Sequence, residues 1–172
     1  MTTKQDLCSM ALLKLGEKPL VALNSDTASA ELARTLYDTT IDALLSLHPW
    51  RFATQAITIE KNSDNEFIIP NNVLRVLRCD GRILGNQVFS TNQNVKMLAV
   101  IRVIPENFPS YFVSLAATKL AMEFCVPLTG NQQMLRILIS LYESEFQNAK
   151  FIDSTTDINP GVNQFSLIDA RF

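Results

Sequence analysis

The chain has 172 residues, a formal net charge of -2 and an apolar fraction of 47%. This length suits one domain with one hydrophobic core, and the mild acidity excludes the basic footprint that nucleic-acid-binding domains carry. Three separated cysteines without a CxxC pair, together with one histidine, do not supply the ligands of a zinc site.

Two helices are expected in the first fifty residues. Thr3 and Asp6 have the spacing of a capping box, and Gly16 and Pro19 favour a helix end, which predicts a helix over about 3–16. A second helix is expected over about 26–48, starting near Ser25 or Asp26, because apolar side chains recur there every three or four residues. They form two stripes, Ala30, Ala33, Tyr37, Ile41, Leu44 and His48, and Leu32, Leu36, Ala43 and Leu47. One stripe can face the core and the other a second helix layer or a neighbouring subunit.

The segment LSLHPWRFAT follows and contains the only histidine and the only tryptophan of the chain. Pro49 stops the preceding helix, and Trp50 and Phe52 flank an arginine as the first residues of a strand would. Two large rings can fill the space between helices and a sheet. We expect His48, Pro49, Trp50 and Phe52 to form a structural junction, with His48 packed at a helix end and not catalytic.

Between residues 54 and 104 the apolar period changes to two, which is typical of strands. Asp80-Gly81 and Gly85-Asn86 have the composition of hairpin turns, so we expect an antiparallel β meander inserted between helices. Basic residues along this insertion are expected on an exposed sheet face, with complementarity to an acidic partner or to passing nucleic acid as the alternative. These residues are Arg75, Arg78, Arg82, Lys96 and Arg102.

Two further helices are expected over about 108–126, closed by Pro127 and Gly130, and over 131–151. The first is apolar nearly all round apart from a narrow polar stripe, as in the centre of a bundle or at an oligomer face. The predicted fold class is therefore α+β, mainly α, with a bundle of about four helices and an inserted β meander in a single domain over residues 1–153.

Residues 154–172 have a different composition, because a polar linker precedes the apolar sequence FSLIDARF. We expect a C-terminal arm that binds a partner, with docking on its own domain as the alternative. The candidate partner-binding side chains are Phe165, Leu167, Ile168 and Phe172.

No phosphate-binding loop, HExxH or GxSxG motif occurs. Glu143 and Glu145 would point about 200° apart on a helix and cannot flank one glycosidic bond, although a distant pair such as Glu123 with Glu143 stays open. We expect no enzymatic activity, no catalytic, cofactor-binding or metal-binding residues, and no cofactor.

Three stretches resemble one protein family. ALLKLGEKPLVALNSDTASAELARTLYDTTIDALLSLHPWRFAT is similar to the N-terminal region of tailed-phage head-to-tail connector (adaptor) proteins of the tail tubular protein A type. IIPNNVLRVLRCDG resembles a strand of that family, and IPENFPSYFVSLAATKLAMEFCVPLTGN resembles its helix and following turn. The resemblance covers about residues 9–150, with HPWRFA as its most specific element. Where the family carries two tyrosines before the strand, this chain has only Phe67.

The resemblance implies a non-enzymatic subunit of a bacteriophage virion or phage-like particle, such as a gene transfer agent, made in the cytoplasm of a bacterial host. Its copies would form a homo-oligomeric ring, commonly a dodecamer, between the portal protein and a downstream tail protein. The ring would continue the channel through which DNA passes, so contact with DNA would be non-specific proximity. We expect no membrane contact, since no apolar run reaches the roughly 18 residues of a membrane span. The alternatives are a cell-wall hydrolase acting during DNA entry and a generic helical adaptor protein.

Overall fold

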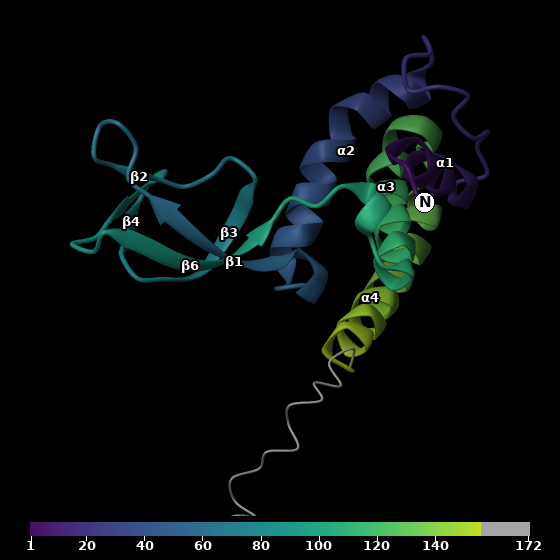
Figure 1. The fold of residues 1–172 in the computed structure, drawn as a ribbon. Helices are drawn as coiled ribbons and strands as arrows, with labels where there is room; N and C mark the ends of the chain where they lie inside the picture. The colour runs from purple at the N-terminus through teal and green to yellow at the C-terminus, as the bar shows by residue number, and fades with distance from the viewer. Residues whose placement is uncertain (156–172) are drawn as a thin grey trace, which may run out of the picture.

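The computed structural model describes residues 1–155 of the 172. The fold class is α+β, mainly α, as the sequence predicts. Four helices make up the helical body, and all the strands are inserted between the second and third helices and project to one side (Figure 1). The helices are α1 (Lys4–Lys14), α2 (Ala28–Leu47), α3 (Ser110–Thr129) and α4 (Gln132–Thr155).

The two N-terminal helices begin at threonine caps. The capping box of α1 is confirmed, because the Thr3 hydroxyl accepts from the Asp6 amide and the Asp6 carboxylate accepts from the Thr3 amide. Gly16 follows α1 with φ of 77°, the left-handed conformation expected there. The cap of α2 is Thr27 and not Ser25 or Asp26, since the Ser25 hydroxyl instead donates to the carbonyl of Ala22.

Helix α3 is the centre of the bundle and contacts each of the other three helices. By length and composition it could cross a membrane, but its buried side chains, among them Phe112, Leu120 and Phe124, belong to the main core. Packing within the bundle therefore accounts for its hydropathy. The expectation that Pro127 closes this helix is wrong, because Pro127 lies inside its last turns and the left-handed Gly130 ends it.

Part of the polar stripe on α3 faces α4. The hydroxyls of Ser114 and Thr118 both donate to the carboxylate of Glu145, and the Lys14 ammonium of α1 lies 3.6 Å from the same carboxylate. Thr118 is fully buried. One acidic side chain of α4 thus accepts hydrogen bonds from two hydroxyl groups of α3, one of them fully buried.

The insertion contains two three-stranded sheets. In one, β6 (Asn94–Ile101) lies between β1 (Thr54–Glu60) and β3 (Val73–Cys79); in the other, β5 (Gln87–Phe89) lies between β2 (Phe67–Ile68) and β4 (Arg82–Leu84). All neighbouring strands are antiparallel. The strand order differs from the simple meander expected, because the last strand, β6, lies between β1 and β3 instead of at the edge of a sheet.

Only one of the two expected hairpin turns exists. Gly85, with φ of 60°, joins the paired strands β4 and β5 as expected. Asp80-Gly81 instead joins β3 of one sheet to β4 of the other, so it is not a hairpin turn. A Cβ at Gly81 would lie 2.6 Å from Val88 Cγ1, so close packing and not a positive φ requires glycine there.

Strand β3 contacts two separate cores. Its register shifts between Val73 and Arg75 and again between Val76 and Arg78. Because each bulge adds one residue, the apolar pattern VLRVLR repeats every three residues instead of two. Val73 and Val76 pack on the core of the insertion, whereas Leu74 and Leu77 pack on the core of the bundle. The insertion core consists of Ile59, Phe67, Ile69, Val88, Val95, Met97 and Ala99.

Candidate functional site

The expected junction is an aromatic cluster centred on Trp50, whose side chain is fully buried. Its ring centroid lies 4.7 Å from that of His48, 5.2 Å from Phe112 on α3 and 5.9 Å from Phe146 on α4. The indole N–H donates to the carbonyl of Leu44 in the last turns of α2, at 3.2 Å. One side chain therefore joins three helices at the point where the chain enters the insertion.

The backbone around Trp50 is a turn and not the expected start of a strand. Pro49 follows the end of α2, a 3-10 helix then covers Arg51–Ala53, and β1 begins only at Thr54. The Thr54 hydroxyl donates to the carbonyl of Trp50 at 2.8 Å. The Phe52 ring packs on Phe112, 4.9 Å away between centroids. The two aromatics thus reach the same cluster from a tight turn.

A buried carboxylate holds this turn in place. Asp153, near the end of α4, is 2% exposed. Both of its oxygens accept from the backbone N–H of Arg51 at 3.2 Å, and one accepts from the Tyr111 hydroxyl at 2.7 Å. The His48 Nε2 lies 3.6 Å from the other oxygen. Because the first N–H groups of a short helix lack partners within it, the carboxylate supplies an acceptor that the turn itself does not have.

Asp153 is the residue of this site that sequence reasoning missed. The apolar pattern of the last helix ends beside Asp153, so the sequence predicts this residue at the boundary between domain and arm. The only local signal is that an acidic side chain near the end of a helix is disfavoured by the helix dipole and so requires a compensating partner.

The protonation states of the cluster follow from burial. Burial lowers the pKa of His48, and the Asp153 carboxylate opposes that effect. Burial, and then the hydrogen bond to Asp153, raise the pKa of Tyr111 well above its ordinary value. At neutral pH the tyrosine is therefore a donor. The Asp153 carboxylate thus holds α3 and α4 to the turn.

A second candidate site is a cavity of about 170 Å³ between α1, α2 and the segment that follows β6. Its apolar walls are Tyr37, Ile41, Val103, Ile104 and Pro105. The Tyr37 hydroxyl is buried and has no hydrogen-bond partner in the described part of the chain. The cavity is therefore mainly a place for an apolar group.

Two ion pairs border this cavity. The Lys4 ammonium lies 3.0 Å from Asp38, and the Arg102 guanidinium forms a two-point contact with Asp42. Each pair joins α2 to another segment. Both acids at the rim are paired with a base, and the Asp38 carboxylate is still largely exposed.

The basic residues of the insertion have two different roles. Besides Arg102, Arg75 also contacts α2, because its guanidinium donates to the Ser46 carbonyl at 3.0 Å. These two residues are exposed as expected, and they also anchor the insertion to the helical body. Arg78, Arg82 and Lys96 are exposed as expected.

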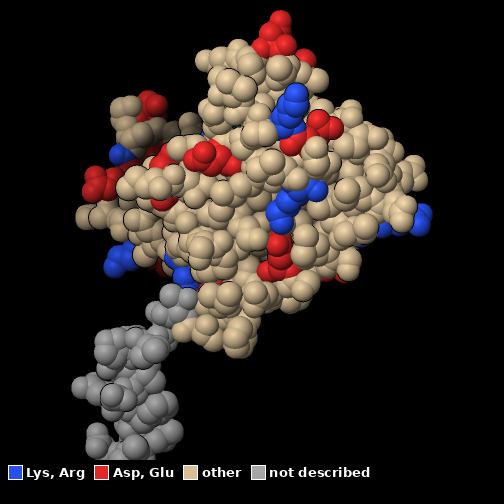
Figure 2. All heavy atoms as spheres, turned by 90° about the vertical axis from the view of Figure 1, so that its right-hand side faces the viewer, with Lys and Arg blue, Asp and Glu red and all other residues tan. Residues whose placement is uncertain are grey.

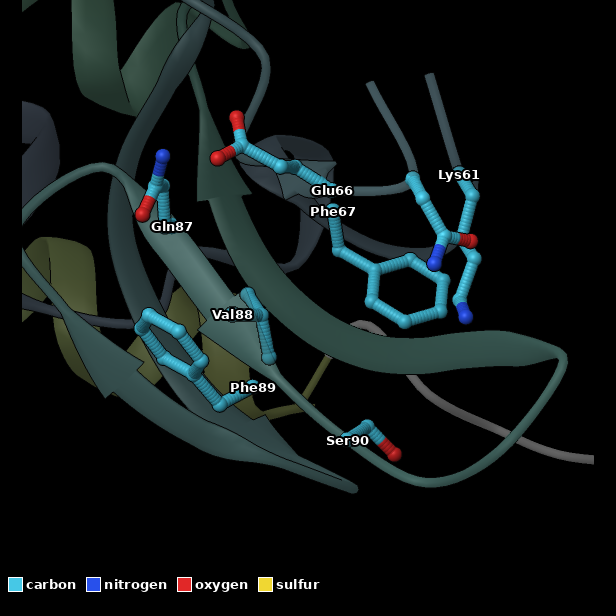
Figure 3. A pocket seen from close by; sticks show the side chains of 8 residues that line it. Lys61, Glu66, Phe67, Gln87, Val88, Phe89 and Ser90 are labelled. Carbon is cyan, nitrogen blue, oxygen red and sulfur yellow. The ribbon is translucent and has the colours of Figure 1, made fainter. Parts of the chain in front are cut away.

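A third cavity, of about 260 Å³, lies at the far end of the insertion. Figure 3 shows Phe67 beside Lys61, while Glu66 extends away from them and Gln87 and Phe89 lie on the other side of β5. Phe67 and Val88 belong to the insertion core, whereas Phe89 is exposed. The polar groups here do not converge on one point, which makes this a weaker candidate for a ligand site.

The face of the molecule seen in Figure 2 is mostly uncharged, with lysine, arginine and acidic side chains scattered over it. No patch of one sign gathers there. Residues 1–155 contain no group of three or more side chains arranged to hold a metal ion. Glu123, one member of the acidic pair left open by the sequence, forms an ion pair with Lys119 one turn away.

The structure describes the four residues expected at the junction but not the four candidate residues of the arm. His48, Pro49, Trp50 and Phe52 lie at the junction as described above. Phe165, Leu167, Ile168 and Phe172 lie outside the described residues.

No known protein-family model matches the sequence, and no curated protein matches it significantly. The connector assignment is therefore carried by the motifs quoted above and is a proposal.

Proposed function

We propose that this protein is a structural subunit of a phage or phage-like head-to-tail connector ring, which joins a portal protein to a tail protein and continues the DNA channel. One observation carries the proposal. The most specific element of the resemblance, HPWRFA, is also the element at which α2, α3, α4 and the insertion meet. A shared motif that is buried in this way fits a family related by architecture more than by catalytic chemistry.

The exposed surface of α4 supports a role in assembly. Ile137, Leu141 and Phe151 are 59%, 40% and 67% exposed, and their spacing puts them on one face of the helix. Helix α4 makes its main contacts with α3 alone. An apolar face of this kind is a candidate interface between neighbouring subunits, and head-to-tail contacts between different surfaces close into rings.

The proposed arm begins at a fixed point. Helix α4 continues to Thr155, beyond the expected end near residue 151, and Asp153 ties its last turn to the junction. The last residue before the proposed arm, Asp153, is therefore held in place by the junction. A segment that starts from an anchored helix end can reach a portal protein or an adjacent subunit without disturbing the bundle.

Electron microscopy of particles produced with and without this protein tests the proposal. We expect particles that lack it to miss a ring of density below the portal, and the purified protein to co-sediment with portal complexes. Particles of identical structure in both preparations would contradict the proposal.

Deletion of residues 156–172 tests the arm separately. The truncated chain should keep the melting temperature of the full chain within a few degrees, because the main core lies within residues 1–155. It should fail to join the portal. Unfolding of the truncated chain, or its normal incorporation into particles, would show that this segment is not an assembly arm.

The cell-wall hydrolase is the second candidate, and the pairing of His48 with Asp153 is the observation that favours it. A histidine held by a carboxylate is part of many hydrolytic sites. Reproducible cleavage of peptidoglycan by the pure protein, abolished by Asp153→Asn at unchanged stability, would replace the connector proposal with this one.

A further inference from the structure

The far end of the insertion exposes large apolar side chains that no part of the described fold covers. Ile83, Leu84 and Phe89 of the β4–β5 hairpin are 40%, 66% and 53% exposed. Figure 1 shows these strands projecting well away from the helices. All three residues of β4 are exposed. Leu84 and Phe89 lie on the face of the hairpin opposite the buried Val88, and exposed apolar side chains that share a face are typical of a contact surface.

The helical body has an apolar cavity that could hold such a side chain. The cavity between α1, α2 and the segment after β6 has apolar walls and a volume of about 170 Å³, and roughly 150 Å³ is enough for a benzene-sized group. Ile104, in its wall, is 60% exposed. The cavity can therefore receive one large apolar side chain from outside.

The two regions also carry opposite charge. The insertion, residues 54–104, has six basic and four acidic side chains, a formal charge of +2. The helical residues 1–53 and 105–155 have eight basic and eleven acidic side chains, a formal charge of -3. Arg82 precedes the apolar hairpin residues, is exposed and forms no ion pair within residues 1–155. At the cavity rim, the Asp38 side chain is 70% exposed.

We propose that the β4–β5 hairpin of one copy binds the α1–α2 cavity of a second copy, with the Leu84 side chain inside the cavity and Arg82 facing Asp38. The inference rests on the proposed function, in that a ring requires contacts between copies. The hairpin and the cavity are different surfaces of the protein. When two copies bind in this way, the cavity of the first and the hairpin of the second remain free. The contact therefore continues from copy to copy instead of closing a two-fold dimer.

Cross-linking between two variants of the full-length chain tests the contact. Both variants carry Cys79→Ser, because Cys79 is the one native cysteine that is not buried. One variant adds Leu84→Cys and the other adds Ile104→Cys. Mixed and oxidised, they should give a disulfide-linked dimer containing one chain of each. The matched control replaces Ile104→Cys by Leu13→Cys, a position on α1 that is 59% exposed, and should give no such product.

Sedimentation supplies a second readout. Leu84→Asp should weaken self-association of the full chain by at least about tenfold, because an apolar contact is lost, while the melting temperature stays unchanged. Leu13→Asp should change neither quantity. A chain that is monomeric at every concentration, or that cross-links through residue 13 as readily as through residue 104, overturns the inference. Cross-linking of Ile104→Cys to Leu167→Cys, in place of Leu84→Cys, would assign the cavity to the C-terminal segment and also overturn it.

These outcomes can be separated from those of the proposed function. A chain that joins portal complexes but shows no contact between residues 84 and 104 keeps the connector function and loses this inference. A chain that cross-links as expected but is absent from particles keeps the contact and loses the connector function.

Discussion

The helical bundle and the β insertion differ in how each is stabilised. The bundle has one continuous core around α3, with an aromatic cluster at one end, and Glu145 accepts from the hydroxyls of Ser114 and Thr118. The insertion has a small core of seven buried residues, and β6 supplies three of them, Val95, Met97 and Ala99. The bundle therefore depends on contacts among four helices, whereas the insertion depends on two small sheets, each built around one central strand, β6 or β5.

The contacts between the two regions are few and of different kinds. Trp50 and Asp153 hold the entering chain, Arg102 and Arg75 bind α2, and β3 packs Leu74 and Leu77 on the bundle. The bundle thus determines where the insertion points, while the strand pattern determines its internal structure. The substitutions below test this division, from the largest expected effect to the smallest.

Trp50→Ala should lower the free energy of unfolding by about 3–5 kcal/mol, because a fully buried ring is removed from the contact of three helices. Urea unfolding followed by circular dichroism measures the effect. Phe89→Ala, at an exposed aromatic position, is the control and should change stability by less than about 0.5 kcal/mol. An unchanged unfolding midpoint for Trp50→Ala would mean that the junction does not stabilise the bundle.

Met97→Ala should destabilise the insertion by about 2–4 kcal/mol and leave the bundle folded, since Met97 belongs only to the insertion core. Hydrogen exchange followed residue by residue is the measurement. Amides of β1 and β6 should lose protection while those of α3 keep it. Equal loss of protection in α3 would show that the two regions unfold as one cooperative unit.

Asp153→Ala should cost about 1–3 kcal/mol, because the Arg51 N–H and the Tyr111 hydroxyl lose their acceptor. Tyr111→Phe removes only one of these donors and should cost about 1 kcal/mol or less. Thermal unfolding of the two variants compares them directly. A larger loss for Tyr111→Phe than for Asp153→Ala would contradict the role assigned to the carboxylate.

The ion pair between Arg102 and Asp42 should contribute only about 0.2–1 kcal/mol, because the Arg102 side chain is 53% exposed. A double-mutant cycle with Arg102→Ala and Asp42→Ala measures the coupling. The coupling energy of an ion pair falls as salt is added, whereas the apolar contacts of Leu74 and Leu77 are not weakened in this way. A coupling energy that does not fall in 1 M salt would mean that the contact is more than a surface ion pair.

The smallest expected effect on stability comes from the protonation of His48. Its pKa should lie below the ordinary value of 6.5, because burial disfavours the charged ring. The unfolded chain then binds a proton more readily than the folded one, so this residue reduces stability as pH falls through about 6.5. Since the chain has one histidine, a proton NMR titration reports it without ambiguity. Asp153→Asn should lower the pKa further, and a rise would show that Asp153 is not the opposing charge.

Local patterns predicted the helices because each pattern has a local physical cause. The capping box at Thr3, the left-handed Gly16 and the hairpin at Gly85 depend only on residues a few positions apart. The same reasoning failed at Asp80-Gly81 and at Pro127. At Gly81 the deciding contact is with Val88 in a neighbouring strand, and at Pro127 the helix continues through the proline until Gly130.

The junction was predicted from the sequence in part. Pro49 and the two aromatics indicated a packed corner, and Trp50 is indeed buried against α3 and α4. The alternating aromatics predict the start of a strand at Arg51–Ala53, but the segment is a turn, because its N-terminal acceptor comes from Asp153, about a hundred residues later in the chain. No periodicity near Trp50 contains that information.

The sequence by itself determined which segments are helical, which alternate as strands and where the large aromatics gather, since side-chain spacing and capping act over a few residues. Only the tertiary structure decided that β6 is the central strand of its sheet, that β3 contacts two cores through its bulges, and that Arg75, Arg102 and Asp153 join distant segments. These features depend on strand order and on the pairing of buried polar groups with partners far away in the chain, and such pairings are selected by the packing of the whole molecule.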